Sequence, residues 1–214
     1  MNPLDVASLA LRYPDAEVLA ARAEVARWCA GLPDGPGVAA LREFAAWWVA
    51  RPAEDLQREY VATFDFSRRT SLDLTYPSFG DRRQRGLALL ALQRRYADHG
   101  MELDGPELPD HLAVMCEFAA VVPQAGLPLL AEFAPAIQLL HLALADAGSA
   151  YAGVVGAIGE LLPPLSDDQW ADVRAMAKDG PPSEDVGLQP FAPPEYMPDA
   201  PAPRAPCRAE RSVA

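Results

Sequence analysis

Apolar residues recur every three or four positions in successive runs through residues 1–179, and most runs close at a proline or a glycine. One run carries Val18, Val25 and Cys29 behind Asp15, and another follows Asn2 and Pro3, two residues typical of a helix start. This spacing indicates amphipathic helices that bury one face. Because no strand–helix alternation or internal repeat interrupts the series, we predict an all-α, single-domain helical bundle of about eight to ten helices.

Residues 65–80 depart from the helical pattern. Leu72, Leu74 and Tyr76 alternate there with Asp73 and Thr75, a period of two that is typical of extended backbone. No second alternating run exists for this segment to pair with. We therefore predict an extended crossing loop near residues 65–80.

Three glycines share one predicted helix near the end of the series. Gly153, Gly156 and Gly159 recur every third position, and each costs about 1 kcal/mol relative to alanine in a helix interior. We expect this spacing to let another helix approach closely.

The last 35 positions have a different composition, because residues 180–214 hold nine of the 22 prolines and few apolar residues. Such a segment cannot bury enough surface to offset its ordering entropy. We predict a helical domain over residues 1–179 and a proline-rich disordered or extended tail over residues 180–214.

Net charge narrows the classes of partner. At −12, the chain is poorly suited to a phosphate backbone, so we expect no nucleic-acid partner, whereas a basic polypeptide would be attracted. The three cysteines are far apart and form no CxxC pair, so neither a disulfide framework nor a cysteine zinc site is indicated. These features favour the cytoplasm.

Membrane and export signals are also missing from the pattern. The most apolar stretch, residues 119–144, is interrupted by Pro123, Pro128 and Pro135, which predicts buried helices and no direct membrane insertion. The twin arginines Arg68 and Arg69 are internal, whereas an export signal precedes an apolar N-terminal stretch.

A search for catalytic patterns finds no glycine-rich phosphate loop, no HExxH and no GxSxG. The three histidines fall on three different predicted helices. The sequence therefore predicts no catalytic residue, no metal site and no cofactor.

Three features gather between residues 56 and 122: an aromatic helix end, a loop with two arginines and a tyrosine, and a helix start with an acid and a histidine. They consist of Tyr60, Phe64 and Phe66; of Arg68, Arg69 and Tyr76; and of Asp110 and His111. The positive end of the helix should keep Asp110 ionised and His111 neutral. An aromatic cleft with a carboxylate at its rim suits a basic amphipathic helix. Alternatively, the aromatic residues are core and Asp110 only starts a helix.

The same region closely resembles the assembly chaperones of respiratory nitrate reductase (the NarJ or delta-subunit family), within the wider all-helical redox-enzyme maturation chaperones. The resemblance lies in residues 60–72 (YVATFDFSRRTSL), 75–76 (TY), 80–81 (GD), 85–86 (RG), 108–112 (LPDHL) and 117–119 (EFA), and residues 107–111 fit the ExxDH motif of the wider family.

The resemblance implies an accessory protein without catalytic activity. It would bind the immature catalytic (alpha) subunit, including its basic N-terminal segment, until the molybdenum cofactor and iron–sulfur cluster are inserted, and would delay membrane docking. Molybdenum cofactor delivery proteins are further expected partners. The expected client-binding residues are Tyr60, Phe64, Phe66, Arg68, Arg69, Tyr76, Asp110, His111 and Glu117.

Two other classes of function compete with this interpretation. One is a small helical enzyme or nucleotide-dependent chaperone that uses Asp110, His111 and Glu117. The other is a structural adaptor whose aromatic residues all belong to the core.

Overall fold

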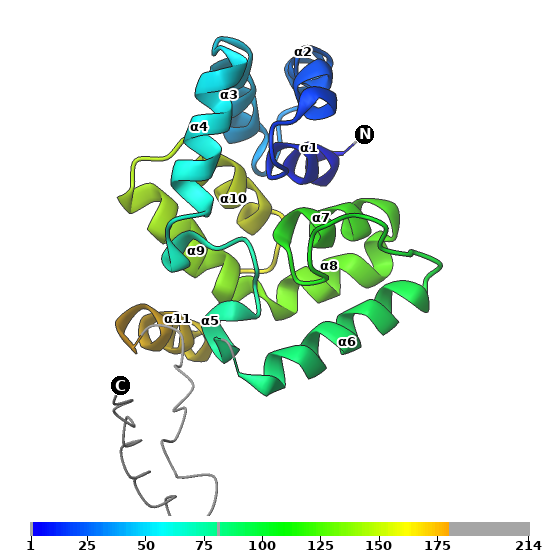
Figure 1. Ribbon diagram of the computed structural model, residues 1–214, viewed down its shortest axis with the longest axis vertical. Coiled ribbons are helices and arrows are strands. Elements are labelled where there is room, and N and C mark those ends of the chain that lie inside the picture. Colours follow the sequence, from blue (N-terminus) through cyan, green and yellow to red (C-terminus); the bar gives the residue numbers. More distant parts are fainter. Residues whose placement is uncertain (1, 81, 180–214) are drawn as a thin grey trace, which may run out of the picture. The chain divides into compact units, whose positions relative to one another are not determined.

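A computed structural model describes residues 2–80 and 82–179, and within these ranges the chain is all helical apart from connecting segments and one isolated β-bridge. Its eleven α-helices confirm the predicted all-α class, with one short turn among them (Figure 1). The predicted tail, residues 180–214, lies outside the described residues. In chain order the elements are α1 (Pro3–Ala10), α2 (Ala16–Gly31), α3 (Val38–Val49), α4 (Ala53–Phe64), the 3₁₀ turn η1 (Arg68–Thr70), α5 (Tyr76–Phe79), α6 (Arg83–Ala97), α7 (Leu112–Val121), α8 (Pro123–Glu132), α9 (Ala134–Asp146), α10 (Tyr151–Glu160) and α11 (Asp167–Asp179).

The first two helices begin at the expected caps. The Asn2 side chain accepts from the backbone N–H groups of Leu4 and Asp5 at 2.8 and 3.3 Å, and the Asp5 carboxylate accepts from the Asn2 N–H at 2.5 Å. Asp15 accepts from two N–H groups at the start of α2, both at 2.9 Å. These bonds satisfy donors that a helix start would otherwise leave without partners.

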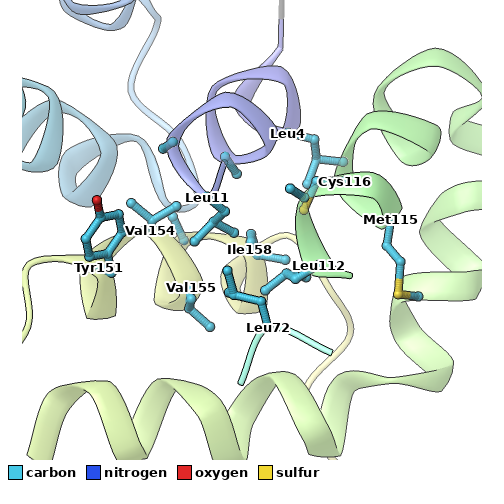
Figure 2. Packing of buried hydrophobic residues seen from close by; sticks show 14 of the residues in the cluster. Leu4, Leu11, Leu72, Leu112, Met115, Cys116, Tyr151, Val154, Val155 and Ile158 are labelled. Atoms are coloured by element: carbon cyan, nitrogen blue, oxygen red, sulfur yellow. The ribbon is translucent and has the colours of Figure 1, made fainter. Parts of the chain in front are cut away.

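The core lies where α1, α7 and α10 meet. Figure 2 shows Leu11, Leu72, Leu112 and Ile158 converging from four separate segments of the chain. All four side chains are buried, and each contributes about 1.5–3 kcal/mol of hydrophobic stabilisation. The core therefore fixes residue 72, and with it the predicted loop, against the start of α7.

An aromatic cluster extends this core towards α3 and α4. The Tyr151 ring of α10 lies 5.3 Å from Phe44 and 4.9 Å from Phe64, measured between ring centroids. Tyr60 lies 4.7 Å from Phe64, and its buried hydroxyl donates to the Leu11 carbonyl at 3.0 Å. Burial is the main reason that the Tyr60 pKa is raised. Tyr60 and Phe64 thus hold α4 against α1 and α10.

The glycines of α10 differ in what they face. A Cβ at Gly156 would lie 2.9 Å from the His141 ring of α9, so a larger residue would displace that contact. Gly153 faces Ala40 of α3 at ordinary distance, and Gly159 has open space. The expected close helix approach therefore occurs at one glycine of the three.

The segment near residues 65–80 is extended only at its centre. The Leu74 N–H donates to the Asp110 carbonyl at 3.0 Å, and the Leu112 N–H donates to the Leu72 carbonyl at 2.9 Å. An antiparallel bridge between Asp73 and His111 results. The expectation that this segment has no pairing partner was wrong, because the partner is only three residues long and carries no alternating pattern.

Within the described residues, no single helix has the length and apolar character needed to cross a membrane. Helices α8 and α9 together have the length and composition of a membrane span, but a bend of 66° separates them.

Candidate functional site

Asp110 is at the centre of a polar network beneath the 72–76 segment. Its Oδ2 accepts from the Thr75 backbone N–H at 3.2 Å and from the Thr75 hydroxyl at 2.5 Å. The same oxygen lies 3.3 Å from the Arg85 guanidinium, which also pairs with Asp73 at 2.7 Å. Arg85 Nε in turn donates to the Thr75 hydroxyl at 3.1 Å. Four side chains from three segments are therefore locked together.

The position of Asp110 differs from the expected rim carboxylate. Its exposed fraction is 0%, since residues 72–75 cover it through the β-bridge. Taking a carboxylate out of water is costly unless a cation compensates it, and Arg85 provides that cation. Burial lowers the Arg85 pKa, but Asp110 and Asp73 outweigh this effect and leave it raised. Asp110 thus pairs within the chain, not at the surface.

His111 is the N-cap residue of α7. Its Nδ1 accepts from the Ala113 N–H at 3.3 Å. Burial, opposed by Asp73, Glu107 and Asp110, holds the His111 pKa below its ordinary value. The imidazole is therefore neutral at pH 7, as expected. The lone pair on its unprotonated Nδ1 accepts the hydrogen bond that caps α7.

A surface hollow of about 390 Å³ opens beside this network. We call it the η1 hollow, and its lining residues are Phe64, Asp65, Phe66, Ser67, Arg68, Ser71, Asp73, Tyr76 and Arg85.

Two aromatic rings define the character of the η1 hollow. Phe66 is 83% exposed, an unusual state for so large an apolar side chain. Tyr76 is 8% exposed, and the guanidinium carbons of Arg68 and Arg85 lie 5.9 and 5.6 Å from its ring centroid. These cations hold the ring by cation–π attraction. The hollow therefore has one exposed ring, Phe66, beside one ring held in place, Tyr76.

The expected site residues divide between several environments. Phe64, Phe66, Arg68 and Tyr76 line the η1 hollow, and Asp110 bonds to Arg85 in its wall. Tyr60 belongs to the core and reaches Leu11.

Two further expected residues, Arg69 and Glu117, also lie outside the η1 hollow. Arg69 lines a second groove, of about 520 Å³, between η1, α9 and α11. Glu117 is exposed on α7 and is not among the lining residues of the hollow.

Six residues of the site were not among those expected: Asp65, Ser67, Ser71, Asp73, Thr75 and Arg85. The alternation of residues 72–76 already put Asp73 and Thr75 on one side of the segment. Only the fold brings Arg85, at the start of α6, against that side. A buried acid requires a nearby cation, but sequence alone does not say which arginine supplies it.

The rival catalytic set does not converge. Asp110 is sealed, the His111 Nδ1 caps a helix, and Glu117 points to solvent. No group of three or more potential metal ligands from His, Cys, Asp or Glu occurs in the described part of the chain.

Comparison with known proteins places the chain in a family. The family model described as the nitrate reductase delta subunit matches residues 33–155, a range that includes the whole η1 hollow. The protein named nitrate reductase molybdenum cofactor assembly chaperone NarJ, from Escherichia coli K12, is 34% identical over 155 residues. That match covers 71% of this chain and 66% of the relative, so the chain spans just under two thirds of the relative's length.

Two further proteins are similar. The nitrate reductase-like protein NarX of Mycobacterium tuberculosis H37Rv is 35% identical over 161 residues, which cover 71% of this chain and 23% of that protein. A crystal structure from Archaeoglobus fulgidus, described as a candidate redox enzyme maturation protein, has a TM-score of 0.57 with 23% identity. It covers 74% of this chain and 90% of its own, and supports the fold. The match of the family model over more than half of the sequence establishes that the chain belongs to the nitrate reductase delta subunit family.

Proposed function

We propose that this chain is an assembly chaperone for respiratory nitrate reductase. It binds the immature catalytic subunit, including that subunit's basic N-terminal segment, in the cytoplasm. Binding keeps the subunit open for the molybdenum cofactor and the iron–sulfur cluster, and delays membrane docking. Family membership and the name of the Escherichia coli relative, a molybdenum cofactor assembly chaperone, support this role. They favour binding over catalysis.

The observation that carries the proposal is the exposed Phe66 at the edge of the η1 hollow. An apolar side chain of the client enters between Phe66 and Tyr76. Each large apolar side chain that is buried contributes about 1.5–3 kcal/mol, before the entropic cost of association is subtracted. Two or three such contacts contribute about 3–9 kcal/mol before that cost, so micromolar affinity, about 8 kcal/mol, also requires polar contacts with the client.

The partner of the client's cation is Asp65. Asp110 is buried and already paired with Arg85, whereas Asp65 is exposed and lines the hollow beside Phe66. A basic residue of the client, adjacent to the apolar one in the hollow, reaches Asp65 without disturbing the network below. This assignment replaces the earlier expectation that Asp110 receives the cation.

The chaperone acts on its client by differential affinity. A protein that binds the open form of the subunit more tightly than the closed form shifts the population towards the open form. The molybdenum cofactor is then cargo delivered to the client, and molybdenum cofactor delivery proteins are partners of the complex. No ligation by the chaperone is needed.

The test is a titration of the full chain with a peptide that carries the basic N-terminal segment of the catalytic subunit. We expect Phe66→Ala and Asp65→Asn each to weaken binding by about tenfold, since one apolar burial or one ion pair at a partly desolvated site is lost. In cells grown anaerobically with nitrate, the same variants should lower the yield of cofactor-loaded nitrate reductase.

Matched controls separate the hollow from the general surface. Val121→Ala removes an exposed apolar side chain from α7, and Glu43→Gln removes an exposed acid from α3. Neither should change the affinity. If the Phe66 and Asp65 variants bind the peptide as tightly as these controls do, the η1 hollow is not the client site.

A further inference from the structure

Helix α6 is a basic element in an acidic protein. Its 15 residues include four arginines and no acidic residue, while the whole chain has a net charge of −12. The helix therefore concentrates positive charge on one short element.

One face of α6 is fully used for packing. Leu92 and Tyr96 are buried, and the Tyr96 hydroxyl donates to the Pro109 carbonyl at 2.6 Å. Arg85 joins the Asp110 network at one end, and Arg95 makes a two-bonded ion pair with Glu132 at 2.5 and 2.7 Å at the other. These contacts fix the rotation of the helix about its axis.

The opposite face is an exposed stripe, which we call the α6 stripe: Arg83, Leu87, Leu90 and Arg94. At 3.6 residues per turn these four positions fall within about 60° of one another. Leu87 is 66% exposed and Leu90 is 51% exposed, and both arginines are exposed. Within residues 2–80 and 82–179, neither Arg83 nor Arg94 has an ion-pair partner.

We propose that the α6 stripe docks an acidic amphipathic helix of a partner protein. Two leucines at i and i+3 form the apolar centre that a partner helix needs for ridge-and-groove packing. Arginines at both ends, about 16 Å apart along the helix, require acidic residues three turns apart on the partner. Charge complementarity thus sets both the sign and the spacing of the partner's side chains.

Two other occupants fit the stripe less well. A second copy of α6 would place arginine opposite arginine in either orientation, which is repulsive. An anionic membrane would repel a chain of net charge −12, and two leucines bury little area in lipid. An acidic helix satisfies both the arginines and the leucines.

The test uses the full chain and two synthetic helical peptides of about four turns. Both peptides carry the same leucine stripe, flanked by glutamates in one and by lysines in the other. In fluorescence anisotropy, we expect saturable binding of the glutamate peptide that weakens at high salt. The variants Arg83→Glu/Arg94→Glu and Leu87→Gln/Leu90→Gln should each lower its affinity by about tenfold or more.

The control is Arg27→Glu/Arg174→Glu, a charge change of the same size at exposed arginines of α2 and α11. It should bind the glutamate peptide like the unaltered chain, and all variants should keep their helical circular dichroism. Equal affinity for both peptides, no saturable binding of the glutamate peptide, or capture by phosphatidylserine vesicles that depends on Arg83 and Arg94 would each overturn the proposal.

This outcome is independent of the proposed function. The α6 variants leave the η1 hollow intact, and the probes are synthetic. Failure at the α6 stripe therefore leaves Phe66 and its client titration unaffected, and failure of that titration says nothing about α6.

Discussion

Phe64 and Phe66 are two positions apart and have opposite environments. Phe64, the last residue of α4, is 8% exposed and touches Tyr60 and Tyr151. Phe66, just beyond the helix end, is 83% exposed at the edge of the η1 hollow. The residue type is the same, so the difference arises from the backbone. Because α4 ends there, with Asp65 as its C-cap residue, the Phe64 ring packs in the core and the Phe66 ring lies at the surface.

The largest expected effect comes from removing the Tyr151 ring, which packs against the buried Phe64. Tyr151 is fully buried and contacts Phe44, Tyr60 and Phe64. Tyr151→Ala should lower the free energy of unfolding by about 3–5 kcal/mol, because a large cavity forms. Phe66→Ala should change it by no more than about 0.5 kcal/mol. Urea unfolding measures both, and similar losses would contradict the difference in burial between Tyr151 and Phe66.

The next effect concerns the ion pair between Arg85, in the wall of the η1 hollow, and the buried Asp110. Arg85→Met leaves Asp110 buried without its cation, and we expect a loss of about 3 kcal/mol. Combining it with Asp110→Asn should recover part of that loss, since the uncompensated charge disappears. Chemical denaturation of the single and double variants measures the recovery, and a purely additive result would argue against the pair.

A smaller effect tests how α4 is tied to α1. Tyr60→Phe removes one hydrogen bond to the Leu11 carbonyl and keeps the ring. The free energy of unfolding should fall by about 1 kcal/mol. Client-peptide affinity should not change, because Tyr60 lies in the core cluster. A changed affinity with unchanged stability would return Tyr60 to the binding site.

The smallest effect is a pH dependence of the free energy of unfolding that arises from His111. The folded chain lowers the His111 pKa, so below the ordinary histidine value of about 6.5 the unfolded chain binds more protons. The stability due to neutral His111 is present above that pH and is lost as the pH falls through the folded-state pKa. His111→Asn keeps a capping side chain and should reduce the slope of unfolding free energy against pH. An unchanged slope between pH 5 and about 6.5 would contradict this.

Helical periodicity predicted the fold well because most of its determinants are local. The caps at Asn2 and Asp15 and the all-α class depend on residues within one or two turns of each other. The candidate site was predicted less completely. Phe66, Arg68 and Tyr76 meet in one hollow, but the burial of Asp110 depends on Thr75 and Arg85, which only the fold brings near. Spacing along the chain cannot tell a carboxylate at a rim from one beneath it.

The β-bridge between Asp73 and His111 has a consequence for protein synthesis. These residues are 38 positions apart, and two backbone hydrogen bonds join their segments. In a nascent chain that has not yet released the start of α7 from the ribosome, residues 72–74 have no backbone partner for this bridge. The network of Asp73, Thr75, Arg85 and Asp110 therefore cannot be completed during synthesis until residues 110–112 reach the segment that was made earlier.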